Sequence, residues 1–274
     1  MNLNLYLLNI KVSRVALLGW SLFLGAYAVL VVYLYPSIDD ATDLVEHLRE
    51  LPLQVKSAIG LDQETIEEAF PGGEFSFYGA LATQYLIWWP VFVSIYAVLF
   101  GSGAITGDVE RGIASILMAQ PFRRYKLVMS KSLAFVSILL ALGTISWGAV
   151  MATVVVMDID VSIANVTVAH AVGLFLVLAV FSYSLLISSL FTRTRSALGV
   201  AALLTFVFYM LNFMSPSFGD IGWLENGSLF HFYQPLDLLT DVAVNWAGIA
   251  VYGGIVLGSH LVSIIVFQRR DIAG

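Results

Sequence analysis

Six long apolar runs divide this 274-residue chain, and they constrain its fold more than any other feature. A helix needs about 20 apolar residues to cross the hydrocarbon core of a bilayer, and each run reaches that length. Only 12% of the residues are charged, whereas a soluble domain carries about 25%. We therefore predict an all-α integral membrane protein that forms one domain over residues 1–274. The six transmembrane helices are expected at residues 15–35, 80–106, 127–157, 161–192, 196–218 and 242–268.

The basic residues predict the orientation of these spans. If both termini, residues 107–126 and residues 193–195 share one side, that side holds eleven of the thirteen Lys and Arg residues. The positive-inside rule makes this side cytoplasmic. Sixteen of the nineteen acidic residues then fall on the other side. We therefore expect both termini in the cytoplasm of a multi-pass plasma-membrane protein, and the excess of Arg over Lys favours a prokaryotic source.

Three segments outside the spans have patterns of their own. Residues 1–13 carry apolar side chains on one helical face, which favours a short interfacial helix. The outer loop, residues 36–76, contains two stretches at helical spacing, 44–51 and 62–70, which predict outer amphipathic helices. The second outer segment, residues 219–241, is rich in aromatic side chains and is expected to lie at, or dip into, the membrane interface.

Several classes of function are disfavoured by what the sequence lacks. The stretch GSGAITGD (101–108) does not continue into the Gly-Lys-Ser/Thr of a phosphate-binding loop. There is no cysteine and no HExxH zinc motif, so we expect no catalytic residue, no metal site and no bound cofactor. No Asp, Glu, Lys or Arg lies deep within an apolar run, which disfavours ion coupling. His170 and His260 are interpreted as hydrogen-bonded packing residues, and no nucleic-acid partner is expected.

The polar stretch between the second and third spans predicts a short helix over residues 107–121. Gly107 is expected to break the preceding span, which would place Asp108 and Glu110 in the first turn, where acids suit the positive end of a helix. Two interpretations stand on physical grounds. The helix is either a docking element for another protein or an amphipathic connector whose basic residues contact anionic lipid headgroups. Its remaining features are the apolar face of Ile113, Ile116 and Leu117, the stop at Pro121, and the basic pair Arg123 and Arg124.

This stretch resembles the signature of ABC transporter permeases of the type-2 exporter class. In that signature an acid-x-Gly turn leads to a Leu-rich turn and then to Pro and Arg. Ile113 departs from the Thr that the family often has after the glycine. The resemblance extends over nearly the whole chain, because the loop after the first span, the outer segment before the sixth and the basic C-terminal end also correspond. The matching positions here are Glu110, Gly112, Leu117, Pro121, Arg123 and Arg124, followed by Lys131.

The resemblance implies that residues 107–121 form a coupling helix. In the family, this element docks on a separate ABC ATP-binding subunit, present in two copies, which holds ATP and Mg²⁺. A second permease copy, or a paralogue, completes the pathway across the lipid bilayer. The chain itself would then be no enzyme. The residues implied in coupling are Asp108, Glu110, Arg111, Gly112, Ile113, Ile116, Leu117, Pro121, Arg123 and Arg124.

Aromatic residues on the second and fifth spans are candidates for lining the pathway, since these spans tend to line the dimer interface in the family. The alternative is ordinary helix packing and lipid contact. The second-span residues recur at one helical face. The candidates are Tyr85, Trp89, Phe92 and Tyr96 on the second span and Phe206, Tyr209, Met210 and Phe213 on the fifth.

The function expected from these patterns is that of the membrane-spanning subunit of an ATP-driven exporter. Two alternatives remain open, a non-transporting membrane scaffold or sensor of the same architecture and an autonomous channel. Copurification of an ATPase whose activity depends on this chain would favour the exporter, whereas ion conductance without ATP would favour the channel.

Overall fold

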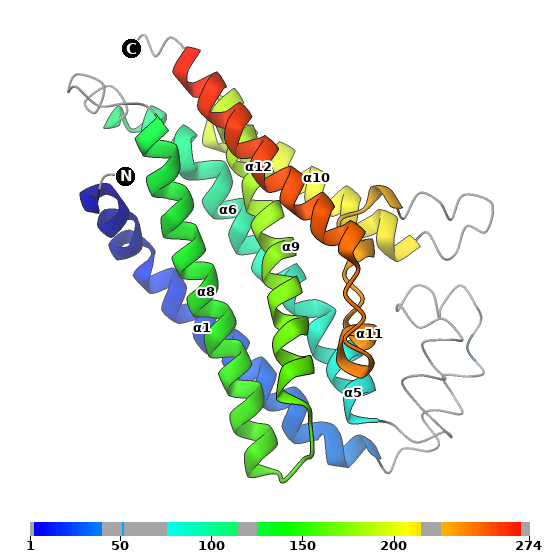
Figure 1. Ribbon diagram of the computed structural model, residues 1–274. Helices are drawn as coiled ribbons and strands as arrows, with labels where there is room; N and C mark the ends of the chain where they lie inside the picture. Colours follow the sequence, from blue (N-terminus) through cyan, green and yellow to red (C-terminus); the bar gives the residue numbers. More distant parts are fainter. Residues whose placement is uncertain (1–2, 40–50, 52–75, 114–124, 215–225, 270–274) are drawn as a thin grey trace.

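The computed structural model describes residues 3–39, 51, 76–113, 125–214 and 226–269, and every regular element within them is helical. Six helical segments are long and apolar enough to cross a membrane, which confirms the predicted fold class. Figure 1 shows them as one bundle. They are α1 (Leu3–Asp39), the segment Phe77–Glu110 that contains α6 (Trp88–Glu110), α8 (Tyr125–Val156), α9 (Ile163–Leu190), α10 (Thr194–Met214) and α12 (Trp246–Arg269).

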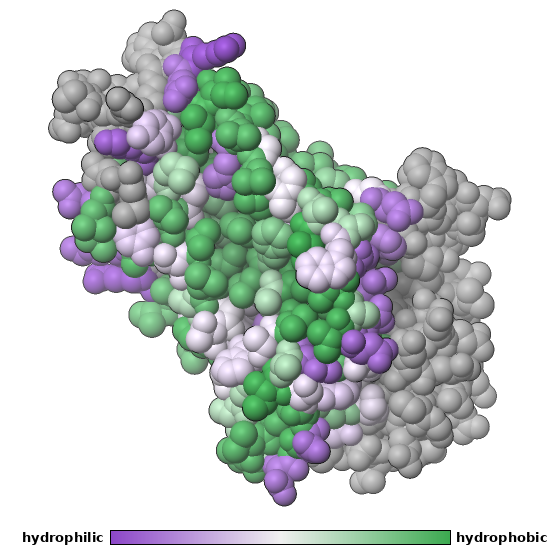
Figure 2. All heavy atoms as spheres, viewed as in Figure 1, coloured by the Kyte–Doolittle hydropathy of each residue, from purple (hydrophilic) through white to green (hydrophobic). Residues whose placement is uncertain are grey.

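Helix α9 is the centre of the bundle. It packs along α6 on one side and α12 on another, while α1 packs chiefly on α8, and α10 rests on α6 and α9. Most of α9 is therefore buried, whereas α1, α10 and α12 leave most of their apolar surface exposed. In Figure 2, hydrophobic side chains cover the middle of the visible face and hydrophilic ones gather toward its ends, as a bilayer requires.

The ends of the spans agree with the sequence expectation at five of the six segments. The observed bounds of Phe77–Glu110, α8, α9, α10 and α12 differ from the predicted ones by no more than four residues. Leu3 and Arg269 lie near the same end of the bundle, as an even number of spans dictates (Figure 1). We call this end the termini end. The amphipathic helices expected at residues 44–51 and 62–70 fall, apart from Leu51, outside the described residues.

Helix α1 corrects the expectation of a separate interfacial helix over residues 1–13. The helix runs without a break from Leu3 to Asp39. No proline precedes Pro36, and isolated glycines such as Gly19 and Gly25 cost only about 1 kcal/mol each in a helix. Nothing in the sequence therefore interrupts the helix before it enters the span.

The second span contains a π-helix, η2 (Leu81–Leu86), between the short α5 (Phe77–Ala80) and α6. Pro90 accounts for its position, because the proline ring crowds the carbonyl four residues earlier, that of Leu86. Within the widened turn the amide of Ile87 bonds to the carbonyl of Ala82 at 3.0 Å. The hydroxyl of Tyr27, on α1, donates a hydrogen bond to the carbonyl of Gln84. The widened turn is therefore supported from a neighbouring span.

The described part of the second outer segment packs against the spanning helices. It contains η5 (Phe230–Phe232) and α11 (Pro235–Thr240), whose apolar side chains are buried. Tyr252 of α12 donates to the carbonyl of Leu229 at 2.8 Å. Burial raises the pKa of Tyr233 well above its ordinary value, so this phenol stays neutral. The turn into α12 holds Val242 at a φ of 53°, a strained value for a β-branched residue.

Candidate functional site

The polar stretch begins inside α6, which corrects the predicted break at Gly107. The helix continues through Gly107 to Glu110. It ends where Gly112 adopts a φ of 69°, a left-handed conformation that glycine reaches without steric cost. The amide of Arg111 bonds to the carbonyl of Gly107 and that of Gly112 to Val109, closing the last turn.

This boundary places Asp108 and Glu110 in the last turn of α6 rather than in the first turn of a new helix. Acids are unfavourable there, because the carbonyl end of a helix carries partial negative charge. Both carboxylates consequently need partners from other elements, and both have them.

Asp108 forms an ion pair with Lys131, which lies in the second turn of α8. The Lys131 Nζ is 2.9 Å from Asp108 Oδ2, and the two side chains are only 12% and 11% exposed. An ion pair this sheltered from water is costly to break from one side. It fastens the end of α6 to α8.

Glu110 is bonded to the first residue of α10. Its carboxylate accepts a hydrogen bond from the backbone N–H of Thr194 at 3.0 Å and another from the Thr194 hydroxyl at 2.5 Å. The carboxylate thus satisfies a free amide at the positive end of α10. It also fastens the end of α6 to the start of α10.

The rest of the predicted coupling helix is described only as far as Ile113. Arg111 and Ile113 are exposed at the end of α6. Five residues of the prediction, namely Ile116, Leu117, Pro121, Arg123 and Arg124, lie outside the described residues. The structure therefore gives the base of the polar stretch and its attachment to two neighbouring spans.

Small residues let α6 approach α9 closely just above this base. A methyl group added at Gly101 would lie 2.7 Å from the Cβ of Ser184. The Ser188 hydroxyl accepts hydrogen bonds from the amides of Ile105 and Thr106 at 3.0 and 3.1 Å. The absence of a side chain at Gly101 thus permits the close packing of α6 on α9.

The aromatic residues of the second span are packed inside the subunit. Tyr85, Trp89 and Tyr96 are buried and Phe92 is half-buried. The rings of Tyr85 and Trp89 lie against His170, with centroids 5.7 and 5.9 Å away. Within this subunit these residues take part in helix packing, and their role in a pathway stays a prediction.

The other two members of that set point toward different neighbours. Phe92 meets the ring of Phe23 on α1 edge to face, at 5.3 Å, and Tyr96 stacks on Phe135 of α8 at 6.3 Å. Tyr85 and Phe92 nevertheless share a neighbour on α1, because the ring of Tyr27 lies 5.6 and 5.5 Å from their rings.

The aromatic residues of the fifth span are differently placed. Helix α10 buries only Ala197 and Ala201 completely. Phe206 is 58% exposed, and Tyr209, Met210 and Phe213 are half-buried. This side of α10 is available to lipid or to another protein.

The two intramembrane histidines have the packing role expected of them. His170 shares a hydrogen bond with the carbonyl of Val166 at 2.9 Å, and His260 with the hydroxyl of Ser132 at 2.9 Å. In the described part of the chain, no three His, Cys, Asp or Glu residues are grouped so that they could hold a metal ion.

Thr194 is a residue of this candidate site that the sequence patterns do not predict. In the sequence, Thr194 stands out only as a threonine at the start of an apolar run, and threonine is common at helix N-termini. Pairing it with Glu110, 84 residues earlier, requires knowledge of which helices are neighbours.

Comparison with known families gives one match. A family model described as "ABC-2 family transporter protein" matches residues 10–272. No curated protein matches the chain.

Proposed function

Because this chain belongs to the ABC-2 family of transporter proteins, we propose that it is the permease subunit of an ATP-driven exporter. Membership of the family implies association with the membrane and with an ABC ATP-binding subunit. In this proposal two ATP-binding subunits, carrying ATP and Mg²⁺, hydrolyse the nucleotide, and this chain supplies the membrane path. The sequence is consistent with that division, since it contains no Gly-Lys-Ser/Thr phosphate-binding motif.

The observation that carries the proposal is the double attachment of the polar stretch. Its base is fixed to α8 through Asp108 and Lys131 and to α10 through Glu110 and Thr194. A force applied to residues 107–121 from the cytoplasm would reach three spans at once. The joint to α8 would resist such a force, because separating Asp108 from Lys131 would leave two sheltered charges unpaired.

Two copies of the chain form the pathway in this proposal. The exposed side of α10 supports it, because Leu203, Phe206 and Val207 are large apolar residues without cover from their own subunit. A second copy would bury this side by two-fold symmetry. The cytoplasmic placement of the termini end is part of the proposal and rests on the eleven basic residues assigned to it.

The test is a pull-down of an ABC ATPase with the permease. The rate of ATP hydrolysis by the ATPase is measured in the same preparation. Leu117→Asp should release or uncouple the ATPase, because a carboxylate would be desolvated where a leucine is expected to dock. Ser115→Asp adds the same charge two residues away and is the matched control. Wild-type retention and hydrolysis in Leu117→Asp would overturn the coupling role of residues 107–121.

A further inference from the structure

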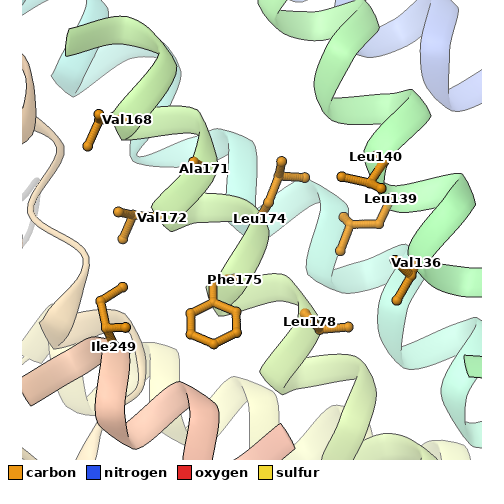
Figure 3. Close-up of a pocket in the computed structure, with 10 residues that line it drawn as sticks. All are labelled: Val136, Leu139, Leu140, Val168, Ala171, Val172, Leu174, Phe175, Leu178 and Ile249. Carbon is orange, nitrogen blue, oxygen red and sulfur yellow. The ribbon is translucent and has the colours of Figure 1, made fainter. Parts of the chain in front are cut away.

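An apolar groove lies between α8, α9 and α12. It encloses about 440 Å³. Figure 3 shows side chains from these three helices facing one common space. We call it the α8–α12 groove. Its lining residues are Val136, Leu139, Leu140, Val168, Ala171, Val172, Leu174, Phe175, Leu178 and Ile249.

The groove exists because α8 and α12 diverge. Near the termini end the two helices are joined by the 2.9 Å hydrogen bond between His260 and Ser132. From there they separate, with α9 between them (Figure 1). The exposed Ala171 on α9 carries too small a side chain to fill the space. The groove is therefore closed toward the termini end and open away from it.

Its length corresponds to one leaflet of a bilayer. On α9 the lining extends from Val168 to Leu178, ten residues that rise about 15 Å at 1.5 Å per residue. The hydrocarbon core of a bilayer is about 30 Å thick. At the open end, the largely exposed Trp246 begins α12 three residues before Ile249, and tryptophan is enriched at the membrane interface.

The chemistry of the lining identifies the occupant. All ten lining residues have hydrocarbon side chains, so no hydrogen bond or charge selects a polar ligand. The groove is continuous with the lipid-facing surface of three spanning helices, and an empty space there would forfeit dispersion contacts. We propose that the α8–α12 groove binds one acyl chain of a phospholipid from the leaflet remote from the termini end.

A phospholipid that carries a photoreactive diazirine in its acyl chain tests this proposal in vesicles containing the full-length chain. Labelled positions are then mapped by mass spectrometry. We expect Ala171 and Leu140 to be labelled several-fold more than Val29 and Leu30, exposed residues of α1 that lie toward the same end of the bundle. Equal labelling of the two surfaces would overturn the proposal, as would crosslinks in the groove to a second protein chain.

A substitution that fills the groove with a larger side chain provides a second, independent test. Ala171→Trp should reduce labelling at Leu140 several-fold by occupying the groove. Ala26→Trp adds the same side chain at an exposed position of α1 and should leave labelling at Leu140 unchanged. If Ala171→Trp does not fold, the wild-type labelling map alone decides. Neither experiment depends on ATPase binding. The lipid proposal can therefore fail while the proposed transport function holds, and the reverse is also true.

Discussion

The carboxylate of Glu110, the last residue of α6, accepts hydrogen bonds from both the backbone N–H and the hydroxyl of Thr194, the first residue of α10. One side chain thereby serves two helix ends. Its charge is unfavourable at the negative end of its own helix, and this cost is offset by its hydrogen bonds at the positive end of α10. The second and fifth spans are consequently tied together at the base of the polar stretch.

Substitution of Glu110 tests this tie. Glu110→Ala removes both acceptors and should lower the midpoint temperature of unfolding. Glu110→Gln keeps one oxygen that can accept the Thr194 amide, so it should fall between alanine and wild type. Thermal unfolding in detergent measures the three midpoint temperatures and so tests whether wild type, Glu110→Gln and Glu110→Ala fall in this order of stability. Arg195→Ala removes an exposed charge from the same region and is the control; identical midpoints for all variants would contradict a role for the tie in stability.

The ion pair between Asp108 and Lys131 should behave as a coupled unit. Removing one partner by Asp108→Asn or Lys131→Met leaves the other charge sheltered and unpaired, at a cost of about 3–5 kcal/mol. The double variant should recover much of that loss. A double-mutant cycle on the free energy of unfolding gives the coupling directly, and additive single effects would show that the two charges act independently.

Gly101 and Gly25 should respond to alanine in opposite directions. The new methyl group at Gly101 would lie 2.7 Å from Ser184 Cβ and 3.0 Å from the Phe181 carbonyl oxygen. We expect a loss of about 1–3 kcal/mol from overpacking. At Gly25 the methyl group meets nothing within 4 Å, and alanine should stabilise the helix by up to about 1 kcal/mol. Thermal unfolding of both variants measures the two effects, and an unchanged or higher midpoint for Gly101→Ala would argue against close α6–α9 packing.

Val242 stores backbone strain that glycine should release. With a φ of 53° in the turn before α12, this residue costs on the order of 1–3 kcal/mol. Val242→Gly should therefore raise the midpoint of unfolding. Val244→Gly, two residues later and outside the left-handed region, should lower it. Destabilisation by both substitutions would mean that Val242 contributes more through its side chain than it loses through its backbone.

The orientation can be tested with single cysteines, since the chain has none of its own. Ser196 lies at the termini end and Asp160 between α8 and α9 at the other end, and both are exposed. Asp160→Cys should react with an impermeant thiol reagent in intact cells, and Ser196→Cys only after the membrane is opened. The reverse pattern would place the polar stretch outside the cytoplasm and remove the basis for coupling.

The six spans could be predicted because hydropathy alone decides which segments enter a bilayer. The end of α6 could not. Gly107 and Gly112 look equivalent in sequence, and the choice between them depends on Lys131 and Thr194, whose positions are known only from the fold. Likewise the neighbours of the aromatic residues from Tyr85 to Tyr96 depend on which helices lie side by side. Periodicity alone cannot predict that Tyr85 and Trp89 lie against His170 of α9.

The π-helix also makes the second span tolerant of a one-residue deletion. The bond from Ile87 to Ala82 reaches back five residues, so this turn holds one residue more than an α-helical path needs. Losing a residue between Leu81 and Leu86 would tighten the turn while leaving the directions of its two flanks nearly unchanged. The same loss in the middle of α9 would rotate everything beyond it by about 100°. A shortened chain can thus keep both the buried aromatic residues of the second span and the tied termini end in position, provided that the deletion falls at Leu81–Leu86.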